Sequence, residues 1–140
     1  MSGVDGALPT RVLIVDDEQG LRTMAERILR DAGYAVDTAS SGAEALDIVE
    51  REGTFALFVI DVLMPEMQGH ELARQMRRRH PDAKVLYFTA HAGHLLQEQH
   101  ALGENDALLS KPVTVAGLRE AVSLLLFGHP RGLERARDLP

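Results

Sequence analysis

Apolar residues recur along the chain in two alternating patterns. Short runs in which every position is apolar, such as VLIV at 12–15 and ALFVI at 56–60, are typical of strands buried on both faces of a sheet. Between such runs, apolar residues recur every three or four positions, as in helices that cover a sheet with one face. Strand-like and helix-like segments alternate five times. The expected strands are 12–15, 35–39, 56–60, 84–89 and 107–110.

Several of the expected helices have recognisable end signals. Gly33 is expected to end the first helix, and Ser41 with Glu44 forms an S-x-x-E capping box at the start of the second. Thr114 is the expected N-cap of the last helix, which extends to residue 127. The remaining expected helices are 69–79 and, with a weaker apolar face, 92–102.

The alternation of strands and helices predicts the fold class. Five strand–helix units with apolar strands indicate an α/β protein with a five-stranded parallel sheet, doubly wound as (βα)5 and covered by helices on both faces. We expect the flavodoxin-like strand order 2-1-3-4-5. Ligands of such sheets bind at the carboxyl ends of the strands, where the strand order reverses, so functional residues are expected at that edge.

Polar residues stand at the carboxyl ends of four expected strands. Asp16 and Asp17 follow the first strand and Asp61 the third, Thr89 ends the fourth, and Lys111 follows the fifth. Taken singly, an aspartate after a strand is most often a turn former, and a threonine or lysine there is commonplace. Together they place three acids, a hydroxyl and an amine on one edge of the sheet, which is hard to explain by structure alone.

This set of side chains fits phosphoryl transfer. Clustered carboxylates suit a hard divalent cation with oxygen ligands, Mg²⁺ in particular. An aspartate on a loop after a central strand can act as a nucleophile and form an aspartyl-phosphate. A metal ion and a lysine then neutralise charge on the transferred group, and a hydroxyl can hydrogen-bond a phosphate oxygen.

The segments LIVDDE, VIDVLMPEMQGHEL, VLYFTAH and SKPV together resemble the receiver domain of bacterial two-component response regulators, over about residues 11–127. The resemblance implies that Asp61 is the phosphoacceptor and takes a phosphoryl group from a histidine kinase or a phosphotransfer protein. It also implies that Mg²⁺ (or Mn²⁺) is bound by Asp17, Asp61 and the backbone carbonyl of Leu63, with Asp16 in the same acidic pocket.

The resemblance assigns roles to three further residues near the acceptor. Thr89 is expected to move toward the phosphate, Lys111 is expected to pair with it, and the peptide bond before Pro112 is expected to be cis. Many receivers carry Tyr or Phe three residues before the lysine, where this chain has Leu108. The usual coupling of a threonine and an aromatic side chain on activation is therefore not expected here.

Three residues beside the acceptor are candidate modulators of the site. Leu63 and His91 occupy positions that tune phosphate loss in the family, and Ala90 is small, which leaves the pocket open. His91 could also contact an incoming partner. An ordinary solvated surface histidine is the competing interpretation.

Composition excludes several classes of function. The chain has no cysteine, which excludes disulfides and thiolate metal sites, and its net charge of −6 argues against direct DNA binding. No apolar stretch is long enough to cross a membrane, and the N-terminal MSGVDGALPT lacks the pattern of a signal peptide. These features predict a cytoplasmic protein.

The expected organisation is an N-terminal lead (1–10), a receiver domain (11–127) and a tail (128–140). No output domain follows the receiver, so we expect a signalling module rather than an enzyme with its own substrate. Its output would be contact with a downstream protein target or relay of the phosphate. Residues 124–127 offer apolar surface for a homodimer, although a role in the core explains most of them equally well.

Three alternatives remain open from the sequence. The chain could be a receiver cut from a hybrid histidine kinase, or a degenerate receiver that binds partners without phosphorylation. A Mg²⁺-dependent phosphatase that forms an aspartyl-phosphate is less favoured. Such hydrolases place D-x-D after the first strand, whereas Asp16 and Asp17 are adjacent and the expected acceptor follows the third strand.

Overall fold

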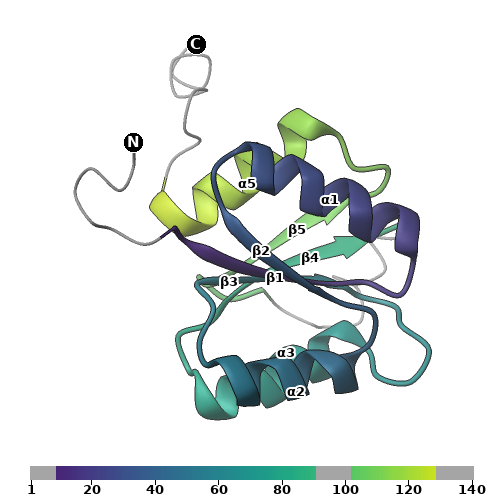
Figure 1. Cartoon of the computed structure of the whole chain (residues 1–140), viewed down its shortest axis with the longest axis vertical. Helices are drawn as coiled ribbons and strands as arrows, with labels where there is room; N and C mark the ends of the chain where they lie inside the picture. The colour runs from purple at the N-terminus through teal and green to yellow at the C-terminus, as the bar shows by residue number, and fades with distance from the viewer. Residues whose placement is uncertain (1–8, 91–101, 129–140) are drawn as a thin grey trace.

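The computed structural model of the chain describes residues 9–90 and 102–128, in which a parallel sheet lies between two layers of helices (Figure 1). Of the helix expected over 92–102, all but Leu102 lies outside the described residues. In chain order, the elements are β1 (Arg11–Val15), α1 (Gln19–Asp31), β2 (Ala35–Ala39), α2 (Gly42–Glu52), β3 (Leu57–Asp61), α3 (Gly69–Arg79), β4 (Lys84–Thr89), β5 (Asp106–Ser110) and α5 (Val115–Phe127).

The five strands are all parallel and lie in the order β2-β1-β3-β4-β5, which confirms the predicted fold class. The strand order reverses at β1, which has β2 on one side and β3 on the other. The register aligns the carboxyl ends, because Val15 pairs with both Ala39 and Ile60, and Thr89 pairs with Ser110. The residues that follow these strands therefore emerge along one edge of the sheet.

Each face of the sheet packs against its own pair of helices. α1 and α5 cover one face and α2 and α3 cover the other (Figure 1). Successive strand residues point to opposite faces, so Leu13 belongs to the core under α2 and α3, whereas Val12 and Ile14 belong to the core under α1 and α5. All five residues of β3 are buried, which explains why its sequence is apolar on both faces.

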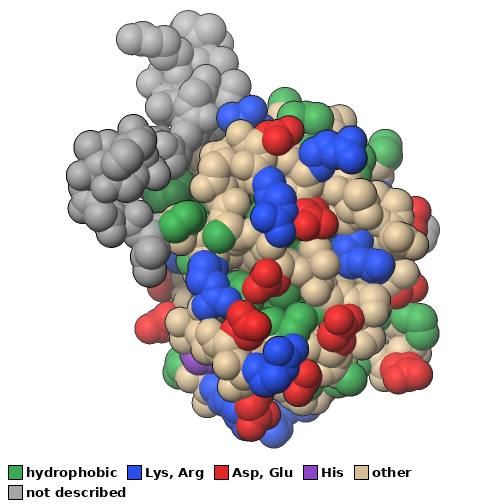
Figure 2. Space-filling model, viewed as in Figure 1, with side chains coloured by type: hydrophobic (Ala, Val, Ile, Leu, Met, Phe, Trp, Pro, Cys, Tyr) green, Lys and Arg blue, Asp and Glu red, His purple; other side chains and the backbone are tan. Residues whose placement is uncertain are grey.

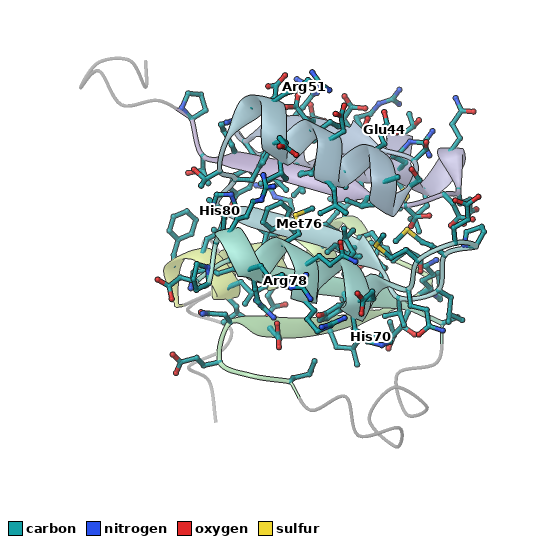
Figure 3. All side chains as sticks on the ribbon, turned by 90° about the horizontal axis from the view of Figure 1, so that it is seen from below. Glu44, Arg51, His70, Met76, Arg78 and His80 are labelled. Atoms are coloured by element: carbon teal, nitrogen blue, oxygen red, sulfur yellow. The ribbon has the colours of Figure 1, made fainter. Side chains whose placement is uncertain are left out.

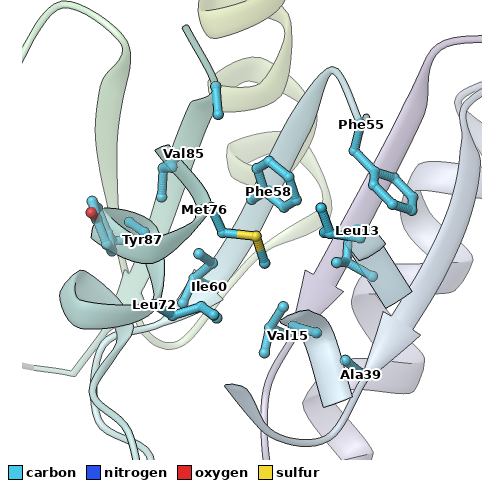
Figure 4. Packing of buried hydrophobic residues seen from close by; sticks show 14 of the residues in the cluster. Leu13, Val15, Ala39, Phe55, Phe58, Ile60, Leu72, Met76, Val85 and Tyr87 are labelled. Carbon is cyan, nitrogen blue, oxygen red and sulfur yellow. The ribbon is translucent and has the colours of Figure 1, made fainter. Parts of the chain in front are cut away.

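The core under α2 and α3 contains the larger cluster of buried apolar residues. Leu72 and Met76 of α3 pack against Phe58 and Ile60 of β3 (Figure 4). α2 and α3 lie side by side, with Met76 between them (Figure 3). On the opposite side of the molecule from this pair, α1 and α5 contact each other as well as the sheet.

The predicted helix caps at Ser41 and Thr114 are confirmed. Ser41 Oγ accepts a hydrogen bond from the Glu44 amide (3.1 Å), and Thr114 Oγ1 accepts one from the Gly117 amide (3.0 Å). The return bond of the predicted capping box differs, because the Glu44 carboxylate accepts from the amide and hydroxyl of Ser40, at 2.7 and 2.9 Å, rather than from Ser41.

The expected strand ends shift by one residue in β1, β3 and β5, and β1 starts at Arg11. β3 starts at Leu57 and extends to Asp61, and β5 starts at Asp106. Backbone pairing continues past the apolar runs, since Asp61 pairs with Phe88 and the Val62 amide donates to the Phe88 carbonyl (2.9 Å). None of the helices in the described part of the chain has the length and hydropathy of a transmembrane span.

Candidate functional site

Asp16, Asp17 and Asp61 form an acidic cluster at the carboxyl edge of the sheet. Each offers a carboxylate oxygen, and these oxygens all lie within 4.8 Å of one another. Asp16 and Asp61 are buried and Asp17 is exposed. The cluster forms because β1 and β3 are neighbouring parallel strands, so their carboxyl ends lie next to each other. It brings together residues that are 44 positions apart in the sequence, from Asp17 to Asp61.

Lys111 brings a positive charge to the acidic cluster. Its Nζ lies 3.5 Å from Asp61 Oδ1 and 4.0 Å from Asp16 Oδ2. The lysine follows β5, and its backbone amide donates to the Thr89 carbonyl (2.8 Å), which ties it to the end of β4. The Lys111–Pro112 peptide bond is cis.

Asp61 is held at the end of β3 by its own loop and by the start of α3. The Leu63 amide donates to Asp61 Oδ1 (3.3 Å), and the Gly69 amide donates to the Val62 carbonyl (2.8 Å). A Cβ on Gly69 would lie only 2.4 Å from the Asp61 carbonyl oxygen. Glycine at this position therefore allows the first turn of α3 to pack directly against the backbone of Asp61.

The two buried carboxylates have raised pKa values. Burial raises the pKa of Asp61 from 3.8 to about 6, and the negative charge of Asp16 adds to this, whereas Lys111 and the Leu63 amide act in the opposite direction. Burial also raises the pKa of Asp16, against the Glu18 amide and Lys111. The negative charge of the cluster is therefore only partly compensated by the protein groups around it.

The residues expected to respond to the acceptor lie at the end of β4 and in β5. Thr89 is the last residue of β4 and is buried, and Ala90 after it is exposed. Leu108 pairs with Tyr87 of β4 and packs, partly buried, against the core under α2 and α3. The Leu63 side chain is 56% exposed and lies on the loop that follows Asp61. His91 lies outside the described residues.

A cleft of about 370 Å³ adjoins the exposed side of the acidic cluster. It opens between the turn that leads into α2 and the loop between β3 and α3. Its lining residues are Asp17, Ser40, Ser41, Gly42, Ala43, Met64, Pro65, Glu66 and Met67. Because Asp17 is part of this lining, solvent reaches the acidic cluster from this side.

Charged side chains do not gather by sign on the described part of the face seen in Figure 2. Side chains of both charges are interspersed there.

Arg22 contacts the acidic cluster although no sequence pattern singled it out. Its Nη1 donates to the backbone carbonyl of Asp16 at 2.7 Å. In the sequence, Arg22 is an ordinary polar position of an amphipathic helix. Its distance of six residues from Asp16 is the only signal that would have suggested a contact, and this signal is weak because it depends on how the chain turns into α1.

The family model for the response regulator receiver domain matches residues 12–123. The sensor kinase CckA of Brucella abortus is 36% identical over 116 residues, which are 82% of this chain but 12% of that kinase. The response regulator receiver protein CpdR of the same organism is 32% identical over 117 residues, 84% of this chain and 97% of CpdR.

Solved structures agree with these relatives. The response regulator TrrA from Thermotoga maritima, crystallised in complex with Mg²⁺ and beryllofluoride, is 34% identical and superimposes with a TM-score of 0.71, over 84% of this chain and 99% of TrrA. The chain belongs to the family of response regulator receiver domains.

Proposed function

We propose that this receiver domain accepts a phosphoryl group on Asp61 from a histidine kinase or a phosphotransfer protein, with Mg²⁺ or Mn²⁺ as the cofactor. The observation that carries the proposal is the acidic cluster itself, in which three carboxylate oxygens lie within 4.8 Å of one another and a lysine lies 3.5 Å from Asp61. Structure alone does not account for this concentration of like charge.

Asp61 is the best placed of the three aspartates to act as the nucleophile. It ends the central strand β3, and one of its oxygens accepts from the Leu63 amide and faces Lys111, which orients the carboxylate. Its pKa of about 6 leaves the carboxylate mostly ionised at pH 7, and the ionised form is the one that attacks phosphorus. In the proposed step an Asp61 oxygen bonds to phosphorus while the bond from phosphorus to the donor histidine nitrogen breaks, and the electron pair stays on that nitrogen.

The chemistry of the acidic cluster suits a hard divalent cation. The ligands on offer are carboxylate oxygens, which Mg²⁺ prefers, and Asp16 Oδ2 is buried without a hydrogen-bond partner among the described residues. The pKa values of Asp16 and Asp61 are raised, so the negative charges of both carboxylates are poorly compensated. A bound cation would supply the missing positive charge. We assign Asp16, Asp17, Asp61 and the Leu63 carbonyl to this ion, which when bound neutralises charge on the transferred group.

The remaining site residues act on the phosphorylated form. Lys111 pairs with a phosphoryl oxygen and the Thr89 hydroxyl hydrogen-bonds another. A shift of Thr89 toward the phosphate then displaces Ala90 and His91, which follow it. Leu108 offers no hydroxyl or aromatic ring, so the conformational change passes through the residues after Thr89 rather than through a paired aromatic side chain. Leu63 and His91 set how fast water removes the phosphate. The result is an altered contact with a downstream protein, or transfer of the phosphate onward.

A second arrangement is favoured by the similarity to CckA. The matched part is 12% of that sensor kinase, and a receiver domain from the hybrid histidine kinase CckA is also among the solved structures that resemble this chain, at 33% identity and a TM-score of 0.70. A receiver within a hybrid kinase would take its phosphate from the same polypeptide. The chemistry at Asp61 is the same in both arrangements.

The test is phosphorylation by a small donor. Purified protein is incubated with acetyl phosphate and Mg²⁺, and its intact mass is measured beside Asp61→Asn and Asp47→Asn, an exposed aspartate of α2. We expect one added phosphoryl group on the wild type and on Asp47→Asn, and none on Asp61→Asn or without the metal. A folded wild type that neither gains a phosphoryl group nor binds beryllofluoride with Mg²⁺ would contradict the proposal and favour a degenerate receiver.

A further inference from the structure

Asp16 has a structural partner at every hydrogen-bonding position except one. Its amide donates to the Ala39 carbonyl (3.1 Å), and its Oδ1 accepts from the Glu18 amide (2.8 Å). Its backbone carbonyl accepts from Arg22 Nη1 (2.7 Å). The fourth position, Oδ2, is buried, has no hydrogen-bond partner in the described part of the chain, and faces Lys111 at 4.0 Å.

The direction of Oδ2 is therefore set by the other three bonds. Fixing the amide and the carbonyl of Asp16 fixes its backbone, and the bond from Glu18 to Oδ1 fixes the rotation of the carboxylate. Oδ2 is then left pointing toward Lys111 and the neighbouring acids. The partners in two of these three bonds are backbone groups, of Ala39 and Glu18. The third partner is the side chain of Arg22, so this bond depends on which residue stands at position 22.

Arg22 also holds the turn at residues 16–18, where it adds to the bond from the Glu18 amide to Asp16 Oδ1. Glu18 is the N-cap of α1, but its side chain makes no capping bond, and α1 has no acidic residue in its first turn. The half-buried Arg22 side chain reaches back six residues from α1 to the end of β1. This bond joins the helix to the strand across residues 16–18, the segment that carries two of the three clustered acids.

We propose that Arg22 is a positioning residue of the cation site, whose guanidinium holds the turn at residues 16–18 so that Asp16 Oδ2 and the Asp17 carboxylate face a common point. The part of this inference that concerns the cation rests on the proposed function, whereas the part that concerns the turn does not. Arg22 contacts the backbone carbonyl of Asp16 rather than a carboxylate of the acidic cluster. It acts through the backbone of Asp16.

The experiment compares Arg22→Met, Arg22→Lys and Arg27→Met with the wild type. Methionine keeps an unbranched apolar stem and removes the donors, lysine restores a donor, and Arg27 is an exposed arginine of the same helix that controls for the loss of one positive charge. Two quantities are measured on the full chain. They are the dissociation constant for Mg²⁺ by calorimetry, and the hydrogen-exchange rate of the Glu18 amide by NMR without metal.

We expect Arg22→Met to weaken Mg²⁺ binding about tenfold, the low end of what loss of a group supporting a metal ligand does, and to speed exchange of the Glu18 amide. Arg22→Lys should recover part of both, because its amine reaches less far, and Arg27→Met should change neither. Unchanged Mg²⁺ affinity and unchanged Glu18 exchange in Arg22→Met would overturn the inference, and equal weakening by Arg27→Met would show a charge effect instead.

The design separates this inference from the proposed function. If the wild type bound no Mg²⁺, the proposed function would fail, while the Glu18 exchange rate would still decide whether Arg22 holds the turn. If Arg22→Met did not fold, Arg22→Lys against the wild type would decide it, because the shorter reach of the amine should give an intermediate Glu18 exchange rate. No protein partner enters the measurement, so an effect on docking cannot be mistaken for positioning.

Discussion

At the N-terminal edge of the sheet charged side chains are paired, whereas at the carboxyl edge the acids outnumber the cation beside them. Arg11, which begins β1, forms ion pairs with Glu52 (3.4 Å) and Asp37 (3.7 Å), donates to two backbone carbonyls, and stacks on Phe55 with its guanidinium carbon 4.1 Å from the ring centre. These contacts tie β1 to β2 and to the loop before β3. The contacts of Arg11 therefore stabilise the packing of these segments against one another.

The same edge has a second pairing, which is more buried. Arg77 of α3 forms an ion pair with Asp106, the first residue of β5, at 2.6 Å, and donates to the Ala83 carbonyl at 2.8 Å. The side chains are 26% and 10% exposed, respectively. These contacts connect α3 to the start of β5 and to Ala83, the residue before β4. At the carboxyl edge, by contrast, Lys111 lies 3.5 to 4.0 Å from two buried carboxylates that repel each other.

The difference separates an edge whose charges stabilise the fold from an edge whose charges fit the proposed phosphoryl transfer. Paired charges with complete hydrogen bonding favour the folded state, whereas buried like charges disfavour it unless a ligand compensates them. Removing a charge should thus have opposite effects at the two edges. One substitution at each edge tests this contrast, and a third tests how closely the carboxyl edge is packed. They follow in order of decreasing expected effect.

The largest effect is expected from Gly69→Ala, which disturbs the carboxyl edge by packing rather than by charge. The new Cβ would lie 2.4 Å from the Asp61 carbonyl oxygen and 2.9 Å from Ile60 Cγ2, and a backbone oxygen of the central strand cannot move aside. We expect a loss of about 3 kcal/mol in the free energy of unfolding, measured in urea. Phosphorylation of Asp61 by acetyl phosphate should slow as well.

Gly20→Ala is the matched control for that substitution. Gly20 lies in α1, and a Cβ there meets nothing within 4 Å. Alanine is the better helix former, so this variant should gain about 0.5–1 kcal/mol. Equal and small effects of the two substitutions would contradict the close packing of α3 against Asp61.

The next effect is expected from Asp106→Asn at the N-terminal edge. It leaves Arg77 half-buried without its carboxylate partner, so we expect the protein to lose about 2 kcal/mol of stability. Urea unfolding at pH 7 measures this. Asp47→Asn breaks an exposed pair with Arg51 in α2 and should change stability by less than about 0.5 kcal/mol. A stabilised Asp106→Asn would contradict the contrast between the edges.

The smallest effect, of opposite sign, is expected from Asp61→Asn without metal. Because burial raises the pKa of Asp61 from 3.8 to about 6, the folded state binds its proton more tightly than the unfolded chain does. Ionisation of Asp61 therefore destabilises the fold, fully above about pH 6 and not at all below about pH 4. A shift of this size is worth at most about 3 kcal/mol. Solvent that reaches the acidic cluster beside Asp17 reduces it, so the variant should be more stable than the wild type by about 1–2 kcal/mol at pH 7.

Unfolding curves between pH 4 and pH 7 check this sign. The gain of Asp61→Asn should disappear toward pH 4, and added Mg²⁺ should stabilise the wild type more than the variant. A difference that stays constant over this range of pH would mean that the charge of Asp61 is not the cause.

The fold was predictable because its strands are apolar on both faces and its helices have local end signals. Ser41 and Thr114 cap the helices that the sequence assigned to them. The strand ends were less predictable, because hydrophobicity marks burial, whereas backbone pairing continues into polar residues such as Asp61 and Asp106. The convergence of the acids followed from topology, since parallel strands bring their carboxyl ends to one edge.

Contacts that depend on side-chain reach could not be predicted in this way. The bond from Arg22 to the Asp16 carbonyl depends on the path of the chain from β1 into α1. The close approach of Gly69 to Asp61 depends on how α3 packs against β3. Neither leaves a periodic signal in the sequence, because each involves a single residue at a single turn.

Tyr87 gives this molecule a built-in optical reporter. The chain contains no tryptophan and two tyrosines, so its intrinsic ultraviolet emission comes from Tyr34 and Tyr87. Tyr87 lies two residues before Thr89 on the same strand, and burial raises its pKa to about 12, which keeps its phenol neutral. A change in the packing of β4 around Thr89 should therefore alter the emission of an unlabelled protein, and Tyr87→Phe identifies the source of that signal.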